Sequence, residues 1–414
     1  MRTDYDAIVV GGGPAGATAA ILLAQAGQRV AVAEKVTFPR RKVCGEFISA
    51  TTWPLLHELG VAGSLRAHAG PVVRRVGVFA GTAQITTPMA AMRLGEVDGG
   101  SAVGREILDT VLLGRAAAAG AVILQPWSLT GFTMDAAGCA CHVEERGSGR
   151  GQTLHAPLLI AAHGSWESGP LPTQAFRKPQ RPSDLLAFKA HFGGGSSLAP
   201  DLMPLLAFPG GYGGMVHTGA GLISLSCCIR RDQWEACRAR WPQHRAGAAV
   251  LAHIVAHCAG AAAALAGATL DGTWLAAGPI RPGIHGFGTG RLFAVGNAAA
   301  EAHPIVAEGI SMAIQSASLL CERLIELQAL APEPATLAII RAHYAREWRR
   351  NFSPRLHAAA LFAHLFMRPL PTRLAAGLMT RFPSVLGLGA RWSGKADPLR
   401  RLHLPDSAVT NHNF

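Results

Sequence analysis

The sequence has few charged residues. Asp, Glu, Lys and Arg make up 15% of the 414 residues, whereas hydrophobic residues make up 49%. A chain of this composition can bury a large core, which excludes a wholly disordered protein. The formal net charge is +12, yet no run of Lys or Arg is long enough to predict a nucleic-acid-binding arm. The surplus charge predicts a solvated basic surface, or attraction to phosphate-bearing cofactors, anionic substrates or an anionic membrane.

The sequence also lacks the cysteine spacing of a structural zinc site. None of its eight cysteines forms a C-x-x-C pair. Its start has no charged region followed by an apolar core and a cleavage site, so we expect no secretory signal, reduced thiols and a cytoplasmic protein. Residues 247–270 contain no Asp, Glu, Lys or Arg. This stretch is mostly Ala and Gly with two histidines, which predicts a packed helix rather than a membrane span.

The first 34 residues predict a strand, a glycine turn, a helix and a second strand. Residues 5–10 lead into Gly11-Gly12-Gly13, and Pro14 suits the first turn of a helix over residues 15–26. In a βαβ unit of this kind, a dinucleotide pyrophosphate binds at the helix N-terminus. Gly11 permits the tight turn, Gly13 permits close approach of the phosphates, and Gly16 permits close packing of helix and strand.

Glu34 follows the second strand, about 20 residues after the glycine motif. A carboxylate at this place accepts hydrogen bonds from ribose hydroxyls and repels a 2′-phosphate, so the unit should hold FAD or NAD rather than NADP. The glycine motif near the N-terminus, a helix starting at Arg105 and a later Gly296-Asn297 pair together favour FAD.

Further along, the pattern predicts a hairpin at 71–88, a helix at 104–119, and strands at 121–124, 139–144 and 158–162. Strands are expected at 185–192 and 221–229, helix at 233–266 with a break at Pro242, a strand at 292–295 and a helix at 305–327. The predicted fold class is α/β, with a discontinuous Rossmann-like FAD-binding domain (1–70, 100–170 and 281–330). A mainly antiparallel substrate domain (71–99 and 171–280) is inserted, and a helical region (331–414) follows.

Three segments resemble known flavoproteins. Residues 38–46, FPRRKVCGE, resemble the P-R-x-K-x-C-G stretch of the geranylgeranyl reductase family, which shares its fold with para-hydroxybenzoate hydroxylase-type aromatic monooxygenases. Residues 104–109 resemble the helix whose Arg contacts FAD in both groups. Residues 296–299, with Pro304 and residues 308–310, resemble the G-D-A-A…P…G-E-G-I motif around the flavin. The resemblance extends from residue 1 to about 325.

The glycine motif and the resemblance together imply a set of cofactor contacts. Arg105 is expected to neutralise the pyrophosphate through a bidentate fork. The N–H groups of Gly309 and Ile310 would face the flavin edge where negative charge develops on reduction. The full predicted cofactor set is Gly11, Gly13, Pro14, Ala15, Gly16, Glu34, Lys35, Cys44, Gly45, Arg105, Gly296, Asn297, Gly309 and Ile310.

Two positions depart from the related sequences. Asn297 stands where the family usually has Asp, which keeps an acceptor but loses a charge-assisted bond. His163-Gly164 stands where related hydroxylases carry Asp-Gly, and this puts direct reduction by NAD(P)H in question. NAD(P)H therefore remains one candidate electron donor among others.

The catalytic candidates are Cys44, His303 and Glu308. The resemblance implies that Cys44 lies near the isoalloxazine, where it is either reactive or a small packing residue. His303 and Glu308, in the flavin-proximal loop, could handle protons, and Glu301 could cap or pair with Arg; a structural role is open for each. Residues 208–214 are expected to form a loop over the substrate, and His217 could lie in the core or the pocket.

These observations predict an FAD-dependent oxidoreductase, with a monooxygenase acting on an apolar or aromatic small molecule as the leading hypothesis. The alternatives are a geranylgeranyl reductase-like reductase of C=C bonds, a flavin-dependent halogenase or oxidase, and a flavin-binding protein without activity. The absence of a W-x-W-x-I-P segment argues against the halogenase. Residues 343–381 mix aromatic residues with Arg, which predicts helices packed on the cofactor domain or in peripheral membrane contact.

Overall fold

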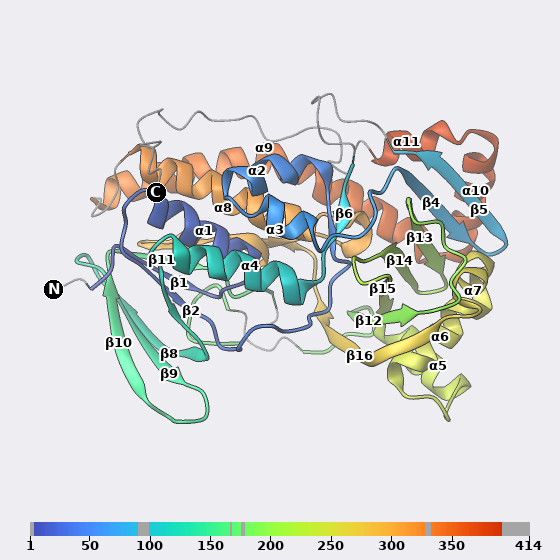
Figure 1. The fold of residues 1–414 in the computed structure, drawn as a ribbon, viewed down its shortest axis with the longest axis horizontal. Coiled ribbons are helices and arrows are strands. Elements are labelled where there is room, and N and C mark those ends of the chain that lie inside the picture. Colours follow the sequence, from blue (N-terminus) through green and yellow to red (C-terminus); the bar gives the residue numbers. More distant parts are fainter. Residues whose placement is uncertain (1–3, 90–98, 166–167, 175–178, 328–332, 391–414) are drawn as a thin grey trace.

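The computed structural model describes residues 4–89, 99–165, 168–174, 179–327 and 333–390. Two sheets lie next to each other along the long axis of the molecule, each with its own helices (Figure 1). Helices α2 (Trp53–Glu58) and α3 (Ala62–Arg66) pack with the first body. The paired strands β3 (Phe47–Ile48) and β6 (Ser101–Ala102) lie between the two sheets.

The first sheet is built from short apolar strands. In the described residues it has the order β18-β19-β11-β1-β2-β7, parallel except for β18 at the edge. Most of its residues are buried, as parallel sheets require. Strand β1 has β2 on one side and β11 on the other. The strand order therefore extends in both directions from β1, which creates a crevice at the strand ends. The strands are β1 (Ala7–Val10), β2 (Val30–Ala33), β7 (Val122–Leu124), β11 (Leu158–Ala161), β18 (Gly288–Thr289) and β19 (Leu292–Ala294).

Three helices cover this sheet. Helix α1 (Pro14–Gln25) contacts both α4 (Arg105–Ala118) and α8 (Gly309–Glu326). An antiparallel sheet extends from the same body, formed by β8 (Trp127–Met134), β9 (Cys139–Glu145) and β10 (Gly151–Ala156). The carboxyl ends of β1, β2 and β11 meet the N-termini of α1 and α4, which prepares a ligand site at this edge.

The second sheet is mainly antiparallel, and only β13 and β4 pair in parallel. Its two faces alternate along each strand, so that Phe188 packs under the helices α5 to α7 while Ala187 faces the other way. Its order is β16 (Thr269–Ile280), β12 (Leu185–Gly193), β15 (Ile223–Arg230), β14 (Gly211–His217), β13 (Leu202–Phe208), β4 (Arg75–Ala80) and β5 (Ala83–Pro88), and the helices are α5 (Arg231–Arg240), α6 (Ala246–His257) and α7 (Ala259–Leu265).

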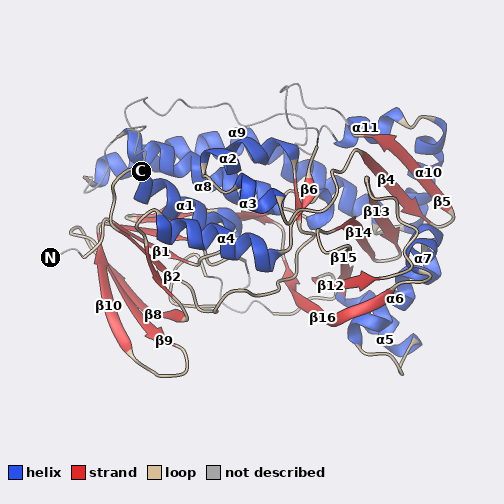
Figure 2. Ribbon diagram, viewed as in Figure 1, coloured by secondary structure: helices blue, strands red, loops and turns tan. Residues whose placement is uncertain are grey.

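Helix α9 (Pro334–Phe366) joins the two bodies and runs along the molecule (Figure 2). Tyr344 and Trp348 in its first half belong to the core of the first sheet, whereas Ala359 and Ala363 in its second half pack with the second sheet. Helices α10 (Pro369–Arg381) and α11 (Ser384–Ala390) then cover β4 and β5. No helix among the described residues is long and apolar enough to cross a membrane.

The predicted α/β class and the C-terminal helices are confirmed, with three differences in detail. Helix α8 begins at Gly309 rather than near residue 305, because a 3-10 turn at Pro304–Val306 is followed by Ala307 with a φ of 54°. Residues 208–214 form a hairpin instead of a loop, since Gly210 makes the turn and Gly211 starts β14. The sequence reasoning also missed β8, β10, β13, β14 and β16.

Candidate functional site

A cavity of about 520 Å³ lies where the strand ends of the first sheet face the second sheet. The first body contributes the glycine turn, residues 42–47, the start of α4, residues 162–165 and residues 301–310. The second sheet contributes parts of β12, β13, β14 and β15. A cavity at this place matches the ligand position of open α/β sheets.

The glycine turn forms one end of the cavity. Gly11 has a φ of 106°, and a Cβ there would lie 2.5 Å from the Ala162 carbonyl oxygen. A Cβ on Gly13 would meet nothing closer than Nη2 of Arg105 at 3.8 Å, so the backbone is open to a ligand. Gly13, Pro14 and Ala15 line the cavity at the start of α1. The free N–H groups of this helix end can therefore meet a phosphate.

Gly16 and Gly296, two of the predicted cofactor residues, do not line the cavity. A Cβ on Gly16 would lie 1.8 Å from the carbonyl oxygen of Gly11, so this glycine lets helix and strand pack. Gly296 has a φ of 58°, and its N–H donates to Ser316 Oγ at 2.9 Å. Both glycines therefore stabilise the backbone around the cavity without lining it.

Glu34 lies at the end of β2 with 4% of its surface exposed, and it lines the cavity together with Lys35. Its Oε2 accepts from the Gly12 N–H at 2.8 Å, and its Oε1 accepts from the Val36 N–H at 3.0 Å. These bonds hold the carboxylate beside the glycine turn. This position is consistent with the predicted hydrogen bond to a ribose.

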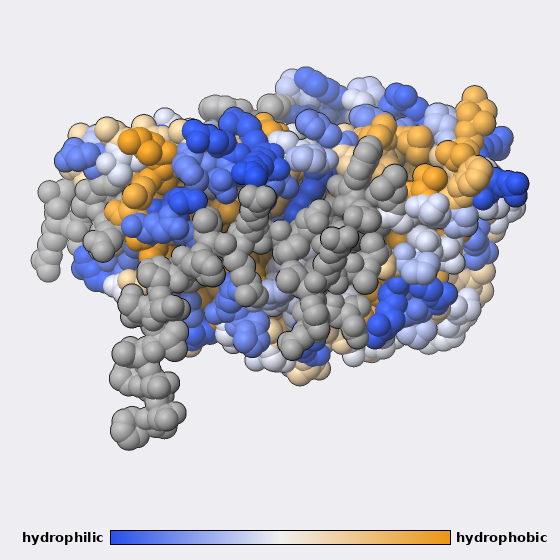
Figure 3. Space-filling model, turned by 90° about the horizontal axis from the view of Figure 1, so that it is seen from above, coloured by the Kyte–Doolittle hydropathy of each residue, from blue (hydrophilic) through white to orange (hydrophobic). Residues whose placement is uncertain are grey.

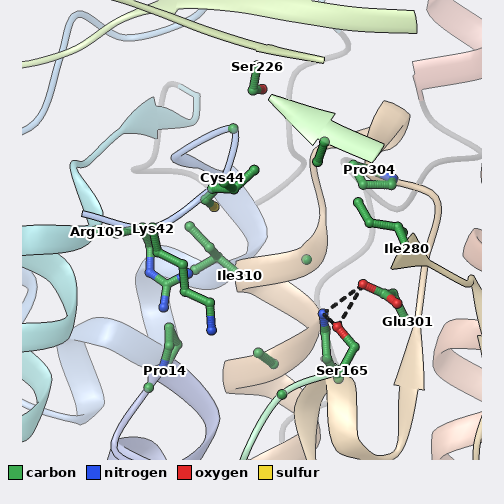
Figure 4. A pocket seen from close by; sticks show the side chains of 18 of the residues that line it. Pro14, Lys42, Cys44, Arg105, Ser165, Ser226, Ile280, Glu301, Pro304 and Ile310 are labelled. Carbon is green, nitrogen blue, oxygen red and sulfur yellow. Dashed lines mark hydrogen bonds between the residues drawn. The ribbon is translucent and has the colours of Figure 1, made fainter. Parts of the chain in front are cut away.

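Arg105 also faces the cavity, but one edge of its guanidinium is already used. Its Nε and Nη2 donate to the two oxygens of Asp109, each at 2.7 Å. Burial disfavours the charged guanidinium, yet the Asp109 carboxylate outweighs this and raises the pKa of Arg105. The fork predicted for the pyrophosphate thus binds Asp109 instead. The guanidinium also interacts with the Cys44 side chain. It still lines the cavity, where Figure 4 shows Arg105 and Lys42 above Pro14.

The start of α8 forms the opposite wall. Gly309 and Ile310 line the cavity, whereas Glu308 does not. The buried Glu308 carboxylate accepts from Ser49 Oγ at 3.3 Å and lies 3.8 Å from Nη1 of Arg355. This differs from the predicted proton-handling position, because the side chain turns away from the cavity and ties the helix start to residue 49.

A polar cluster lies beside this wall. Ser165 Oγ donates to Oε1 of Glu301 at 2.9 Å, and Asn297 Nδ2 lies 3.5 Å from the same oxygen (Figure 4). Burial raises the pKa of Glu301 to about 7, although the hydrogen bond from Ser165 acts in the opposite direction. The Glu301 carboxyl group can therefore take up or release a proton near neutral pH.

His303 and Tyr212 form a second polar pair in the cavity wall. Nδ1 of His303 lies 3.1 Å from the Tyr212 hydroxyl. Burial lowers the pKa of His303 to about 4, so its ring is neutral at neutral pH. Burial also raises the pKa of the Tyr212 phenol, which stays protonated. The pair offers neutral hydrogen-bonding groups next to an apolar surface.

Cys44, Gly45 and His163 also line the cavity. The Cys44 thiol is partly exposed and accepts from the Glu46 N–H at 3.4 Å. Both ring nitrogens of His163 are engaged, with the Gly164 carbonyl at 2.7 Å and Thr173 Oγ1 at 2.9 Å. His217 lies outside the cavity wall, and its Nε2 is 2.9 Å from the Leu198 carbonyl.

A buried charge cluster next to Cys44 was not predicted. Glu46, fully buried and with a φ of 62°, pairs with Nζ of Lys189 and lies 2.9 Å from Nε2 of His191. Burial alone would raise the pKa of Glu46, but the His191 hydrogen bond and the Lys189 charge lower it to about 2. The cluster ties the 38–48 segment to β12. Glu46 lies more than 140 residues before Lys189 and His191 in the sequence, so no local sequence pattern predicts the cluster.

The wall supplied by the second sheet is mostly apolar. The same cavity is lined by the glycine turn, so it combines an end that suits a phosphate with an apolar end. The apolar lining residues from this side are Ala187, Met203, Leu205, Met215, Val216, Cys227 and Ile280, and Ile305 from the turn before α8 adds to them.

Comparison with known proteins identifies related sequences and folds. The sequence model of one family, FAD binding domain, matches residues 4–334. Menaquinone reductase of Mycolicibacterium smegmatis is 32% identical over 165 residues, which are 40% of this chain and 39% of that protein. The match thus spans well under half of the relative.

Solved structures of other proteins share the fold, as two examples show. The myxobacterial chondrochloren halogenase CndH has a TM-score of 0.72 at 22% identity, covering 86% of this chain and 83% of that one. Pseudomonas aeruginosa PqsL has a TM-score of 0.67 at 17% identity, covering 94% and 99%.

Proposed function

The chain belongs to the FAD binding domain family, and from this premise we propose that it is an FAD-dependent monooxygenase of an apolar or aromatic small molecule. Bound FAD supplies the redox chemistry, namely electron uptake and reaction with oxygen. The observation that supports the proposal is the single cavity that joins the glycine turn to the apolar wall of the second sheet.

In this proposal the first body holds the cofactor. The open backbone at Gly13 and the positive charge of Arg105 in the cavity wall suit a pyrophosphate, and Glu34 suits a ribose. Gly309 and Ile310 line the cavity at the start of α8, so their N–H groups would stabilise the negative charge that a bound flavin gains on reduction. Cys44 and Gly45 would pack against the ring from the other side.

The second sheet would bind the substrate. Its apolar side chains exclude water from the reacting groups, which also protects reactive species from side reactions. Tyr212 and the neutral His303 can orient a polar group of the substrate. Glu301, whose pKa is raised to about 7, can accept or donate the proton that the reaction needs.

Anaerobic stopped-flow absorbance tests the proposal. FAD-loaded protein is mixed with NADPH or NADH and then with oxygenated buffer containing a panel of aromatic compounds. We expect flavin bleaching, followed by oxygen uptake that depends on one of these compounds and incorporation of ¹⁸O into it. Bleaching would also show that His163 is compatible with nicotinamide donors. Oxygen uptake without any labelled product would contradict the monooxygenase.

A second candidate is a reductase of C=C bonds, favoured by the carboxyl group of Glu301. Reduction of an alkene by a flavin needs a proton as well as a hydride, and Glu301 is protonated below about pH 7. The local similarity to menaquinone reductase agrees with this candidate. Reoxidation of the reduced flavin by a polyprenyl compound without oxygen, with one C=C bond of that compound saturated in the product, would support the reductase and contradict the monooxygenase.

We further propose that α10 contacts an anionic membrane surface. Its buried residues Thr372, Ala376 and Met379 face β4 and β5, whereas Leu374 and Leu370 on the other side are 77% and 72% exposed. Figure 3 shows hydrophobic residues gathered at the end of the molecule that carries α10 and α11. The sequence has no Asp or Glu from residue 348 to 396, although it has several Arg. An exposed apolar stripe flanked by Arg is typical of interfacial helices.

Vesicle sedimentation tests this contact. The protein should bind vesicles containing phosphatidylserine more strongly than pure phosphatidylcholine vesicles, and Leu374→Asp should abolish the binding. Val122→Asp, at an exposed apolar residue of the first sheet, is the control that should bind normally. Equal binding of Leu374→Asp and the unaltered protein would contradict the proposal.

A further inference from the structure

A second cavity of about 780 Å³ lies beside the first and shares Ile280 and His303 with it. Its other walls come from the segment before β12, the turn between β13 and β14, residues 281–285 and the junction of α9 and α10. The sequence reasoning did not predict it, because these four segments are far apart in the chain. The two cavities are adjacent, because Ile280 and His303 line both of them.

The second cavity is lined by cationic side chains. Arg181, Arg230, Arg281 and Arg368 all contribute, and Asp184 is the one carboxylate among the described lining residues. Asp184 is used by Arg281, whose Nε and Nη2 donate to it at 2.9 and 2.8 Å. In the described chain, no carboxylate pairs with the side chains of Arg181 or Arg368, and both residues are exposed. Arg230 is also used, because it pairs with Asp232 outside the cavity lining. The uncompensated positive charge of the wall therefore comes from Arg181 and Arg368.

The charge of this wall contrasts with the mostly apolar wall that the second sheet gives to the first cavity. Arginine side chains bind phosphate and carboxylate groups with a planar fork, so several of them around one hollow select an anion. The two side chains at the junction of the cavities carry no charge at neutral pH, because burial lowers the pKa of His303 to about 4 and Ile280 is apolar. Beyond these two side chains the apolar wall of the second sheet begins.

We propose that the second cavity binds the anionic end, a phosphate or a carboxylate, of an amphiphilic substrate whose apolar end occupies the first cavity. The inference deepens the proposed function, on which it rests, by assigning the substrate a charged end. Arg181 and Arg368 are the specificity residues of this subsite, since each presents its guanidinium without a carboxylate partner in the described chain. Arg281 is held in place by Asp184 and forms the base of the subsite.

Ligand binding to the FAD-loaded protein tests the inference. The probes are decyl phosphate, decanoate and decan-1-ol, each below its micelle concentration, and the readouts are calorimetry and the shift of the flavin absorbance band. We expect decyl phosphate or decanoate to bind at least tenfold more tightly than decan-1-ol. The tighter of the two anions identifies the headgroup. Either Arg181→Gln or Arg368→Gln should raise the Kd of the anion about tenfold, while decan-1-ol binding stays unchanged.

A matched control is Arg373→Gln, at an exposed arginine of α10 outside the cavity, which should bind the anion normally. Two results would overturn the inference: an anionic probe that binds no more tightly than decan-1-ol, and a loss in Arg373→Gln as large as in the cavity variants. Because binding is measured without turnover, intact anion binding with no oxygen uptake in the stopped-flow test would reject the monooxygenase and leave the subsite standing.

Discussion

Glu301 should make the free energy of unfolding depend on pH, and the substitution Glu301→Gln should remove this dependence. Burial raises its pKa from the ordinary 4.5 to about 7. Since each pKa unit corresponds to about 1.4 kcal/mol, this difference corresponds to about 3 kcal/mol. The folded state binds the proton more tightly than the unfolded state. The stabilisation is therefore complete below pH 4.5 and is lost as the pH rises through about 7.

Glu301→Gln keeps the shape and the acceptor for Ser165 Oγ but cannot ionise. Relative to the unaltered protein, its free energy of unfolding should rise steadily between pH 4.5 and 8, by about 3 kcal/mol in total. Urea denaturation of protein stripped of FAD, followed by tryptophan fluorescence at several pH values, measures this difference. Glu235→Gln, at an exposed residue of α5, is the control and should give a constant difference. A difference for Glu301→Gln that does not change with pH would refute the reasoning.

Two further substitutions test the packing and the charges around the site. Gly16→Ala should destabilise the fold by about 2 kcal/mol or more and release FAD, because its Cβ would lie 1.8 Å from the Gly11 carbonyl oxygen; thermal unfolding and flavin retention check this. Gly114→Ala, on the exposed side of α4 with open space around it, should instead stabilise by about 0.5–1 kcal/mol, and a similar loss in both variants would contradict the argument. Lys189→Met should cost about 3 kcal/mol in urea denaturation, because it removes a partner of the buried Glu46 carboxylate, and a cost below about 1 kcal/mol would show that the pair contributes little.

Much of the first body could be predicted from local pattern. The glycine spacing, the apolar strands and Glu34 lie within one βαβ unit, where backbone geometry alone fixes their relative positions. Arg105 was found through the resemblance of residues 104–109 to the helix whose Arg contacts FAD in related flavoproteins. What its guanidinium binds was not predictable, because Asp109 one turn later competes with a phosphate for the same edge.

For the candidates in the loop before α8, the local sequence pattern did not predict which side chains face the cavity. Glu301, His303 and Glu308 lie within eight residues, and sequence alone could not rank them. The left-handed Ala307 turns the chain, so Glu308 points into the core while Glu301 and His303 face the cavity. The direction of a side chain depends on this single backbone angle and on the residues packed behind it.

The sequence by itself determined the class of the fold, the FAD-binding unit and most residues of its phosphate end, because these depend on contacts between neighbours in the chain. The tertiary structure decided the charge cluster of Glu46, the apolar wall and the arginine-lined cavity. Each of these forms only when segments more than 100 residues apart pack together. The physical reason is that burial and charge pairing depend on contacts between distant segments, which form only in the folded protein. No local sequence pattern predicts these contacts.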